Sequence, residues 1–326
     1  MIVKKNILLG AGAVAVLALA GLAINTVEKV PQALADNSAN NQVQSPIAQG
    51  RVRRLTIAFP GRGDTADLQN KANAVAQFLS RELGMPVDAF VADDTSAVEA
   101  LRANKADVAF LSSRPALKAQ QLANARLYLA EVRPNYSGRH TYRSVFVVPT
   151  NSTLKSQATA KQTLEQLRGK KMAFTSPTSG SGFIFPVGEM VKQGLVPNRD
   201  RLNGFFGQIS YGNNYSGALQ AVLRGQADVA AVSEYALFPP YITAEEAKKL
   251  RVLHGISGVP AHGVAIDDDV PNPMRERIIN AMLKLNQPAN NQLLKNLYNS
   301  TELVRVNGNQ HLQPMREALS RAGIEP

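Results

Sequence analysis

The chain has 326 residues, enough for one large or two ordinary domains, and 44% of them are hydrophobic, as in globular proteins. It contains no cysteine, which excludes disulfides, thiolate metal sites, cysteine nucleophiles and a lipid-attachment cysteine. The formal net charge is +11, but the basic residues are scattered and tryptophan is absent. No nucleic-acid motif matches, so this charge indicates a solvated surface that helps to attract anions.

The N-terminal stretch predicts export. Two lysines precede an apolar run at 7–24, and Ala33 and Ala35 form a small-residue cleavage site, so residues 1–35 are predicted to be a signal peptide. A charged spacer before the cleavage site makes an uncleaved N-terminal anchor the alternative. Residues 36–50 are rich in Asn, Gln and Ser and predict a disordered linker. An exported chain without a clear anchor favours a periplasmic location.

The next part of the chain alternates short apolar strands with helices. Strands are expected at 55–59, 87–91 and 106–111. A helix capped by Asp64 or Thr65 is expected to run to Gly84, because its apolar residues recur at helical spacing, and a second helix is expected at 96–103. Strand–helix alternation with short loops predicts an α/β fold whose sheet is mostly parallel.

The same pattern recurs later, with strands at 171–174, 205–211 and 227–232 and helices at 181–193 and 217–224. These segments predict a second sheet with flanking helices.

Two segments, 96–109 and 217–230, align without a gap and share Ala-Asp-Val-Ala. Coincidence between Ala-rich helices is the alternative, but the shared context favours two lobes of the same design. Asp107 and Asp228 then belong to the turns that lead from helix to strand.

Strong strands at 142–148 and 263–266 stand at the two ends of the second pattern, and helices are expected at 272–286, 289–299 and 312–322. They predict a chain that builds one lobe, crosses to a second and returns. The predicted lobes are 51–145 plus 263–326, and 146–262.

Ligands of open parallel sheets bind beyond the carboxyl ends of the strands. In both predicted lobes these ends carry small polar residues. The predicted cleft residues are Arg62, Ser112, Ser113 and Arg114 from one lobe, and Thr178, Ser179, Gly180, Ser181, Tyr215 and Glu234 from the other, with Tyr142 and His262 at the crossings.

The most informative stretch is 171–186, Lys-Met-Ala-Phe-Thr-Ser-Pro-Thr-Ser-Gly-Ser-Gly-Phe-Ile-Phe-Pro. It predicts a buried strand, a loop of hydroxyl residues and glycines, and a helix start. Helix-start N–H groups and Ser and Thr hydroxyls are donors for an oxyanion, and Gly180 and Gly182 allow the backbone to come close. An ordinary capped helix start is the alternative, since the same residue types are favoured there.

This loop, together with Arg-Gly-Gln-Ala-Asp-Val-Ala at 224–230, resembles the periplasmic phosphate, phosphite and phosphonate binding proteins of ABC transporters. The resemblance runs from about residue 55 to 324. It implies a two-lobe periplasmic-binding-protein (type II) fold that closes over its ligand and performs no chemistry. In that family an Asp-Pro-x-Ser-Thr-Ser-Gly loop donates to the phosphoryl oxygens, and it falls here on 176–182.

Departures from the family pattern bear on the ligand. Gly180 stands where the family has Thr, and Tyr215 where it has His. His262 stands at one acidic position that contacts the ligand amine in aminophosphonate-binding members, while Glu234 lies near another. Two family aromatics fall near Asp94 and near Ser112 and its neighbour. These changes favour a small oxyanion such as phosphate, phosphite or methylphosphonate, and leave a sulfonate open.

Several candidate residues keep two interpretations. Arg62 and Arg114 pair with the anion or face solvent, as most arginines do. His262 lines the cleft or only hydrogen-bonds at the crossing, and Tyr142 closes over the ligand or packs in the core. Glu234 beside an anion would be repulsive unless it meets an amine, shares a proton or faces away.

The chain is therefore predicted to be an exported solute-binding protein that captures a phosphorus oxyanion for an ABC permease in the inner membrane. We expect a monomer, with no cofactor, metal or nucleic-acid partner. The four histidines are not closely spaced, which argues against a metal site. The rivals are a ligand-sensing subunit for a membrane receptor and an enzyme on the same fold. Against the enzyme, Gly-x-Ser-x-Gly and His-Glu-x-x-His motifs do not occur.

Overall fold

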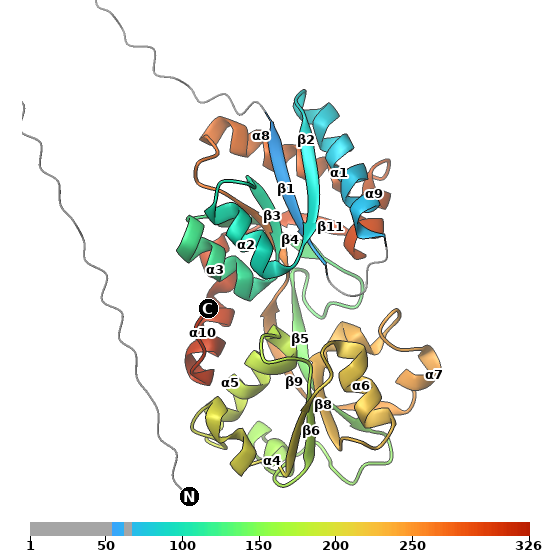
Figure 1. Cartoon of the computed structure of the whole chain (residues 1–326). Helices are drawn as coiled ribbons and strands as arrows, with labels where there is room; N and C mark the ends of the chain where they lie inside the picture. Colours follow the sequence, from blue (N-terminus) through green and yellow to red (C-terminus); the bar gives the residue numbers. More distant parts are fainter. Residues whose placement is uncertain (1–53, 62–66) are drawn as a thin grey trace, which may run out of the picture. The chain divides into compact units, whose positions relative to one another are not determined.

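The computed structural model describes residues 54–61 and 67–326, which belong to one compact unit, Gly50–Pro326. Two β-sheets flanked by helices form the two lobes of this unit (Figure 1). The predicted signal peptide, the linker and Arg62 lie outside the described residues.

The first sheet has six strands in the order β11-β4-β10-β3-β1-β2. Strand β1 pairs in parallel with β2 and β3, whereas β10, β4 and β11 add antiparallel pairs. The sheet is therefore mixed. Antiparallel neighbours, unlike parallel ones, do not need a crossover connection between them. The strands are β1 (Leu55–Pro60), β2 (Val87–Ala92), β3 (Val108–Leu111), β4 (Arg126–Val132), β10 (Gly263–Ile266) and β11 (Glu302–Arg305).

Helices cover both faces of this sheet, because alternate strand residues are apolar on each side. Ile57 and Phe59 face the side where α1, α8 and α9 pack, and Ala58 faces α2 and α3. The helices are α1 (Leu68–Leu83), α2 (Asp94–Arg102), α3 (Ser113–Ala123), α8 (Asn272–Leu283) and α9 (Asn291–Tyr298).

The second sheet has five strands in the order β7-β6-β8-β5-β9, and it too is mixed. Its strands are β5 (Thr141–Pro149), β6 (Lys171–Phe174), β7 (Gln208–Tyr211), β8 (Val229–Ser233) and β9 (Leu250–Pro260). Its α-helices are α4 (Ala160–Glu165), α5 (Phe185–Lys192), α6 (Tyr215–Leu223) and α7 (Ala244–Ala247). A π-helix (Gly180–Ile184) leads into α5, and 3-10 helices span Arg199–Gly204 and Glu234–Leu237.

The repeated Ala-Asp-Val-Ala segments have the same role in both lobes. Asp107 Oδ2 accepts from the backbone N–H of Thr56 at 2.7 Å, and Asp228 Oδ2 accepts from that of Lys171 at 2.8 Å. In each case the aspartate accepts a hydrogen bond from the backbone near the start of the neighbouring parallel strand. This equivalence indicates that the two lobes follow one design.

The chain crosses between the lobes twice. It leaves the first sheet after β4 through residues 133–140, and it returns from β9 to β10 through Ala261 and His262. The sequence predicted that the strands at 142–148 and 263–266 form the two crossings. In the structure, β5 and β9 are hydrogen-bonded to each other as far as the crossings, where Thr141 lies opposite Pro260. The predicted lobe boundary at 145/146 falls inside β5.

The C-terminal helix α10 (Gly308–Ala322) contacts both lobes. It packs against α5 of the second lobe and against α3 and β4 of the first (Figure 1). A Cβ built on Gly188 of α5 would lie 3.1 Å from the carbonyl oxygen of Ala318, so a glycine favours this close approach. Helix α10 therefore adds a third connection beside the two crossings.

Candidate functional site

A cavity of about 590 Å³ lies between the carboxyl ends of the parallel strands of the two lobes. Its walls come from both lobes and from both crossings, so its shape depends on how the lobes are held together. Nine of the predicted residues line it: Ser112, Ser113, Arg114, Tyr142, Thr178, Ser179, Gly180, Tyr215 and His262. Further lining residues are Gly61, Asp93, Asp94, Arg133, Thr175, Ser176, Asn213, Asn214, Ser216, Tyr235, Tyr241 and Met315.

The loop that follows β6 forms one wall of this cavity. Thr175 fixes its start, because its hydroxyl donates to the carbonyl of Ala231 in β8 at 3.0 Å. Ser179 caps the π-helix, and its Oγ accepts from the backbone N–H of Gly182 at 3.1 Å. The hydroxyls of Ser176 and Thr178 lie 3.3 Å apart. The loop thus presents several hydroxyls and the first N–H groups of a helical segment to the cavity.

The loop also touches the opposite wall. A Cβ built on Gly180 would lie 3.0 Å from Cε of Met315 in α10 and 4.0 Å from Oγ of Ser113 in α3. The missing side chain at this position therefore lets Met315 of α10 approach the loop closely.

Ser181 does not face the cavity. It is fully buried, and its Oγ lies 2.8 Å from Oγ of Ser233 and 2.9 Å from Oη of Tyr215. Its carbonyl accepts from the hydroxyl of Ser144 at 2.6 Å. The residue predicted to donate to a ligand instead supports Tyr215, which does line the cavity, since the π-helix turns Ser181 inward.

Tyr215→Phe is expected to reduce the free energy of unfolding by about 1 kcal/mol, because one buried hydroxyl leaves the contacts with Ser181 and Ser233. We also expect weaker ligand binding, since the ring no longer has a fixed position. Urea unfolding and calorimetric titration measure the two effects. Tyr211→Phe is the control, because Tyr211 is 43% exposed on β7 and does not line the cavity.

The first-lobe wall is charged. Asp93 caps α2, with its Oδ1 accepting from the backbone N–H of Ser96 at 2.8 Å, and this hydrogen bond lowers the pKa of Asp93. Asp94 accepts from the hydroxyl of Ser112 at 2.9 Å. Arg114 lines the cavity and donates to the carbonyl of Glu325. Burial lowers the pKa of Arg114, and the charge of Arg199 adds to this shift.

Tyrosines surround the wall at the crossings. Tyr142 stacks on Tyr136 with ring centroids 5.1 Å apart, and Tyr235 meets both rings. Tyr142 is 3% exposed, so it packs in the core and lines the cavity at once. Burial raises its pKa, as does the neighbouring Tyr215, so its hydroxyl stays protonated and remains a donor.

Arg133 is the cation of this wall. It stands at the end of β4, lines the cavity and is buried. Burial opposes its charge, but Glu131 and nearby tyrosines outweigh this and raise the pKa of Arg133 further above its usual range. Sequence reasoning missed this residue, because residues 126–140 carry no clear periodicity and most arginines are exposed.

Glu234 faces away from the cavity. Its carboxylate accepts from the backbone N–H groups of Ser137 and Arg143, at 2.8 and 2.9 Å, and from Nε of Arg143 at 2.7 Å. Burial by itself would raise the pKa of Glu234, but the hydrogen bonds from Arg143 and Ser137 outweigh it and lower the pKa. The residue therefore ties the outgoing crossing to the second sheet.

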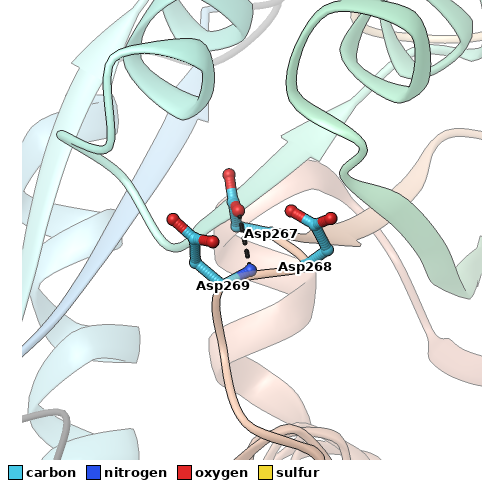
Figure 2. A group of neighbouring side chains, drawn as sticks. All are labelled: Asp267, Asp268 and Asp269. Atoms are coloured by element: carbon cyan, nitrogen blue, oxygen red, sulfur yellow. Dashed lines mark hydrogen bonds between the residues drawn. The ribbon is translucent and has the colours of Figure 1, made fainter. Parts of the chain in front are cut away.

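One acidic grouping occurs elsewhere in residues 54–61 and 67–326. Asp267, Asp268 and Asp269 follow β10, and one oxygen of each lies within 4.8 Å of the others. Figure 2 shows the three side chains projecting from one side of the turn, with the backbone N–H of Asp269 donating to Asp267 Oδ1 at 3.1 Å. Two of the three are exposed, and we assign no ion to them.

In the part of the chain that the structure describes, none of the helices combines the length and the apolar character needed to cross a membrane.

The sequence is similar to a known protein family and to a phosphate-import protein. The sequence profile of a family described as "ABC transporter, phosphonate, periplasmic substrate-binding protein" matches residues 57–312. The phosphate-import protein PhnD of Mycolicibacterium smegmatis is 24% identical over 194 residues, which are 59% of this chain. The matched part spans 58% of the length of that relative.

Solved structures share the fold at low sequence identity. A Xanthomonas citri protein bound to ATP matches with a TM-score of 0.67 and 18% identity, covering 83% of this chain and 98% of that one. PhnD1 from Prochlorococcus marinus in complex with methylphosphonate gives a TM-score of 0.65 and 16% identity, covering 83% and 98%. A binding protein component of an ABC phosphonate transporter from Pseudomonas aeruginosa gives 0.61 and 19%, covering 82% and 86%. The shared fold consists of two lobes, each a sheet flanked by helices.

Proposed function

Because this chain belongs to the family of periplasmic substrate-binding proteins of phosphonate ABC transporters, we propose that it captures a phosphorus oxyanion between its lobes. The ligand is phosphate, phosphite or a small phosphonate, and the partner that receives it is a permease in the inner membrane. The family implies export to the periplasm, and we propose that residues 1–35 direct it. The protein acts as a monomer.

The observation that carries this proposal is the loop from Thr175 to Gly182 on the wall of an inter-lobe cavity. Its hydroxyls and N–H groups are neutral donors, and tetrahedral oxyanions carry several acceptor oxygens in a small volume. A cavity of about 590 Å³ leaves room for an organic substituent on phosphorus. The names of two relatives point the same way, one importing phosphate and one binding methylphosphonate.

Binding without chemistry fits the hydrogen bonds of the described cavity better than catalysis does. The hydroxyl of Ser112 donates to a carboxylate, and the hydroxyls of Ser176 and Thr178 contact each other. His262 lies beside Glu131, with Nδ1 3.4 Å from Oε1. A nucleophilic mechanism of the Ser–His type would instead pair such a hydroxyl with a histidine base.

Thermal unfolding of the purified full chain, refolded free of ligand, tests the proposal. A ligand that binds only the folded state stabilises it by about 2.7 kcal/mol at a hundredfold excess over its dissociation constant. We expect phosphate, phosphite or methylphosphonate to raise the midpoint, and methanesulfonate to raise it less. Thr178→Ala should reduce the shift, while Thr150→Ala, at an exposed position away from the cavity, should keep it. Unchanged midpoints with every phosphorus oxyanion would contradict the proposal.

A further inference from the structure

A buried ion pair stands behind the cavity, where the chain leaves the first lobe. Nε of Arg133 lies 3.0 Å from Oε1 of Glu131, and the two side chains are 4% and 2% exposed. A buried pair of this kind adds little stability, because removing both charges from water costs about as much as their attraction returns. Its place beside the cavity raises the question of a role in binding.

Glu131 is held by groups from the first lobe and from both crossings. The hydroxyl of Ser300 donates to its Oε2 at 2.7 Å, and the hydroxyl of Tyr136 donates to its Oε1 at 3.1 Å. On the return crossing, His262 lies beside the same carboxylate, and its carbonyl accepts from the backbone N–H of Glu131 at 2.9 Å. These contacts fix the position of the carboxylate.

Arg133 is the member of the pair that lines the cavity. The guanidinium lies over the ring of Tyr235, 5.6 Å from its centroid, and Arg133 lines the cavity whereas Glu131 does not. A guanidinium keeps its proton under all physiological conditions and offers several donors in a plane, which suits a phosphonate or phosphate group.

On the basis of the proposed function, we infer that Arg133 is the ligand-binding cation of the cavity and that Glu131 is its positioning residue. Together they select a doubly charged tetrahedral oxyanion over a singly charged one of the same shape. Neutral loop donors recognise the tetrahedral shape, and the buried guanidinium adds a preference for charge, since Coulomb attraction grows with ligand charge and is weakly screened in a buried site.

Other charged or titratable groups face the same cavity and enter the balance. They are Asp93, Asp94, Arg114, His262 and the tyrosines Tyr142, Tyr215, Tyr235 and Tyr241. Asp93 caps α2 and Asp94 accepts from Ser112, so both carboxylates are directed toward first-lobe donors. Arg133 differs from Arg114 in being almost fully enclosed, with groups of both lobes around it.

Methylphosphonate and methanesulfonate form the matched ligand pair, because both have a methyl group and three oxygens on a tetrahedral centre. Only the phosphonate becomes a dianion near neutral pH. We expect calorimetric titration of the full chain to show tighter binding of methylphosphonate, with affinity rising as pH passes its second ionisation. Arg133→Gln should weaken methylphosphonate binding roughly 30-fold, the loss of a charged hydrogen-bond donor, and flatten the pH dependence. Arg133→Lys should restore part of both.

Arg168→Gln is the control variant. Arg168 also pairs with a glutamate, Glu165, and lies over an aromatic ring, that of Phe205, but away from the cavity. We expect it to bind both ligands as the wild type does. If Arg133→Gln keeps the preference for methylphosphonate, the inference is wrong while the proposed function stands. If the wild type binds neither phosphorus nor sulfur oxyanions, the proposed function fails first.

Glu131→Gln separates positioning from charge. The substitution removes a negative charge behind the cavity, and this change alone should tighten anion binding. Loss of the contact that positions Arg133 should instead weaken binding about tenfold, as for outer-shell partners of bound ions. We expect the weakening. Ser300→Ala keeps both charges and removes one hydrogen bond to Glu131, so it should also weaken anion binding, but by a smaller factor. Melting curves without ligand show whether each variant folds. If Glu131→Gln does not fold, the affinity of Ser300→Ala tests the positioning role instead. Affinity at or above that of the wild type in a folded variant overturns the positioning role.

Discussion

Gly182→Ala is expected to abolish ligand binding and to lower the free energy of unfolding by about 2 kcal/mol, as for overpacking of a dense core. A Cβ at this position would lie 2.1 Å from Oγ1 and 2.4 Å from Cβ of Thr175, and 2.8 Å from Oγ of Ser179. Thr175 holds the loop to β8, so it has no room to retreat. The added methyl group must therefore push the whole oxyanion loop out of place.

Gly204→Ala is the matched control, because a Cβ there meets nothing within 4 Å and the backbone does not have a positive φ. Denaturant unfolding and calorimetric titration of both variants give the comparison. If Gly182→Ala binds methylphosphonate as the wild type does, the loop from Thr175 to Gly182 is not the ligand wall.

Glu234→Gln is expected to destabilise the protein by roughly 2 kcal/mol at neutral pH, within the range for hydrogen bonds to a charged group. The wild-type carboxylate accepts from Ser137 on the outgoing crossing and from Arg143 in β5, and an amide cannot accept with both of its terminal atoms. Because the guanidinium of Arg143 is half-exposed, solvent screens its attraction to Glu234, and the expected loss of stability is therefore modest.

The pH dependence of this effect has a defined sign. Because the folded protein lowers the pKa of Glu234, its carboxylate stabilises the fold above the ordinary pKa of a glutamate. This stability is lost as pH falls through the lowered folded pKa, where the wild type and the variant should converge. Urea unfolding across acidic pH measures the difference. Glu245→Gln, which removes an exposed pair with Lys248, should change stability little at any pH, and a Glu234→Gln difference independent of pH would contradict this assignment.

The sequence predicted the family and the two-lobe fold, and the comparisons confirm both. Strong signals carried this prediction, namely compact apolar strands such as β1 and β3 and the repeated Ala-Asp-Val-Ala. The elements it missed have weak signals. Helix α3 begins with Ser113, Arg114 and Pro115, which look like a turn, although a proline is well tolerated in the first turn of a helix.

The predicted residues that line the cavity come from the hydroxyl loop and from several other segments, whereas Arg133, Tyr235 and Tyr241 were not predicted. The hydroxyl loop is contiguous, so its residues could be identified together. Arg133 follows β4, whereas Tyr235 and Tyr241 lie in the segment between β8 and α7, and only packing brings these side chains together. Ser181 was placed on the wrong side because a π-helix, which sequence spacing does not reveal, opens the helical segment.

The most direct test of the account is a crystal structure of the protein grown with methylphosphonate. We predict one ligand per chain, with phosphonate oxygens within hydrogen-bond distance of the Ser176–Gly180 loop and of the Arg133 guanidinium. A phosphonate bound at another place, or a cavity that stays without phosphonate at saturating concentration, would contradict the claim that this loop and this cation form the binding site.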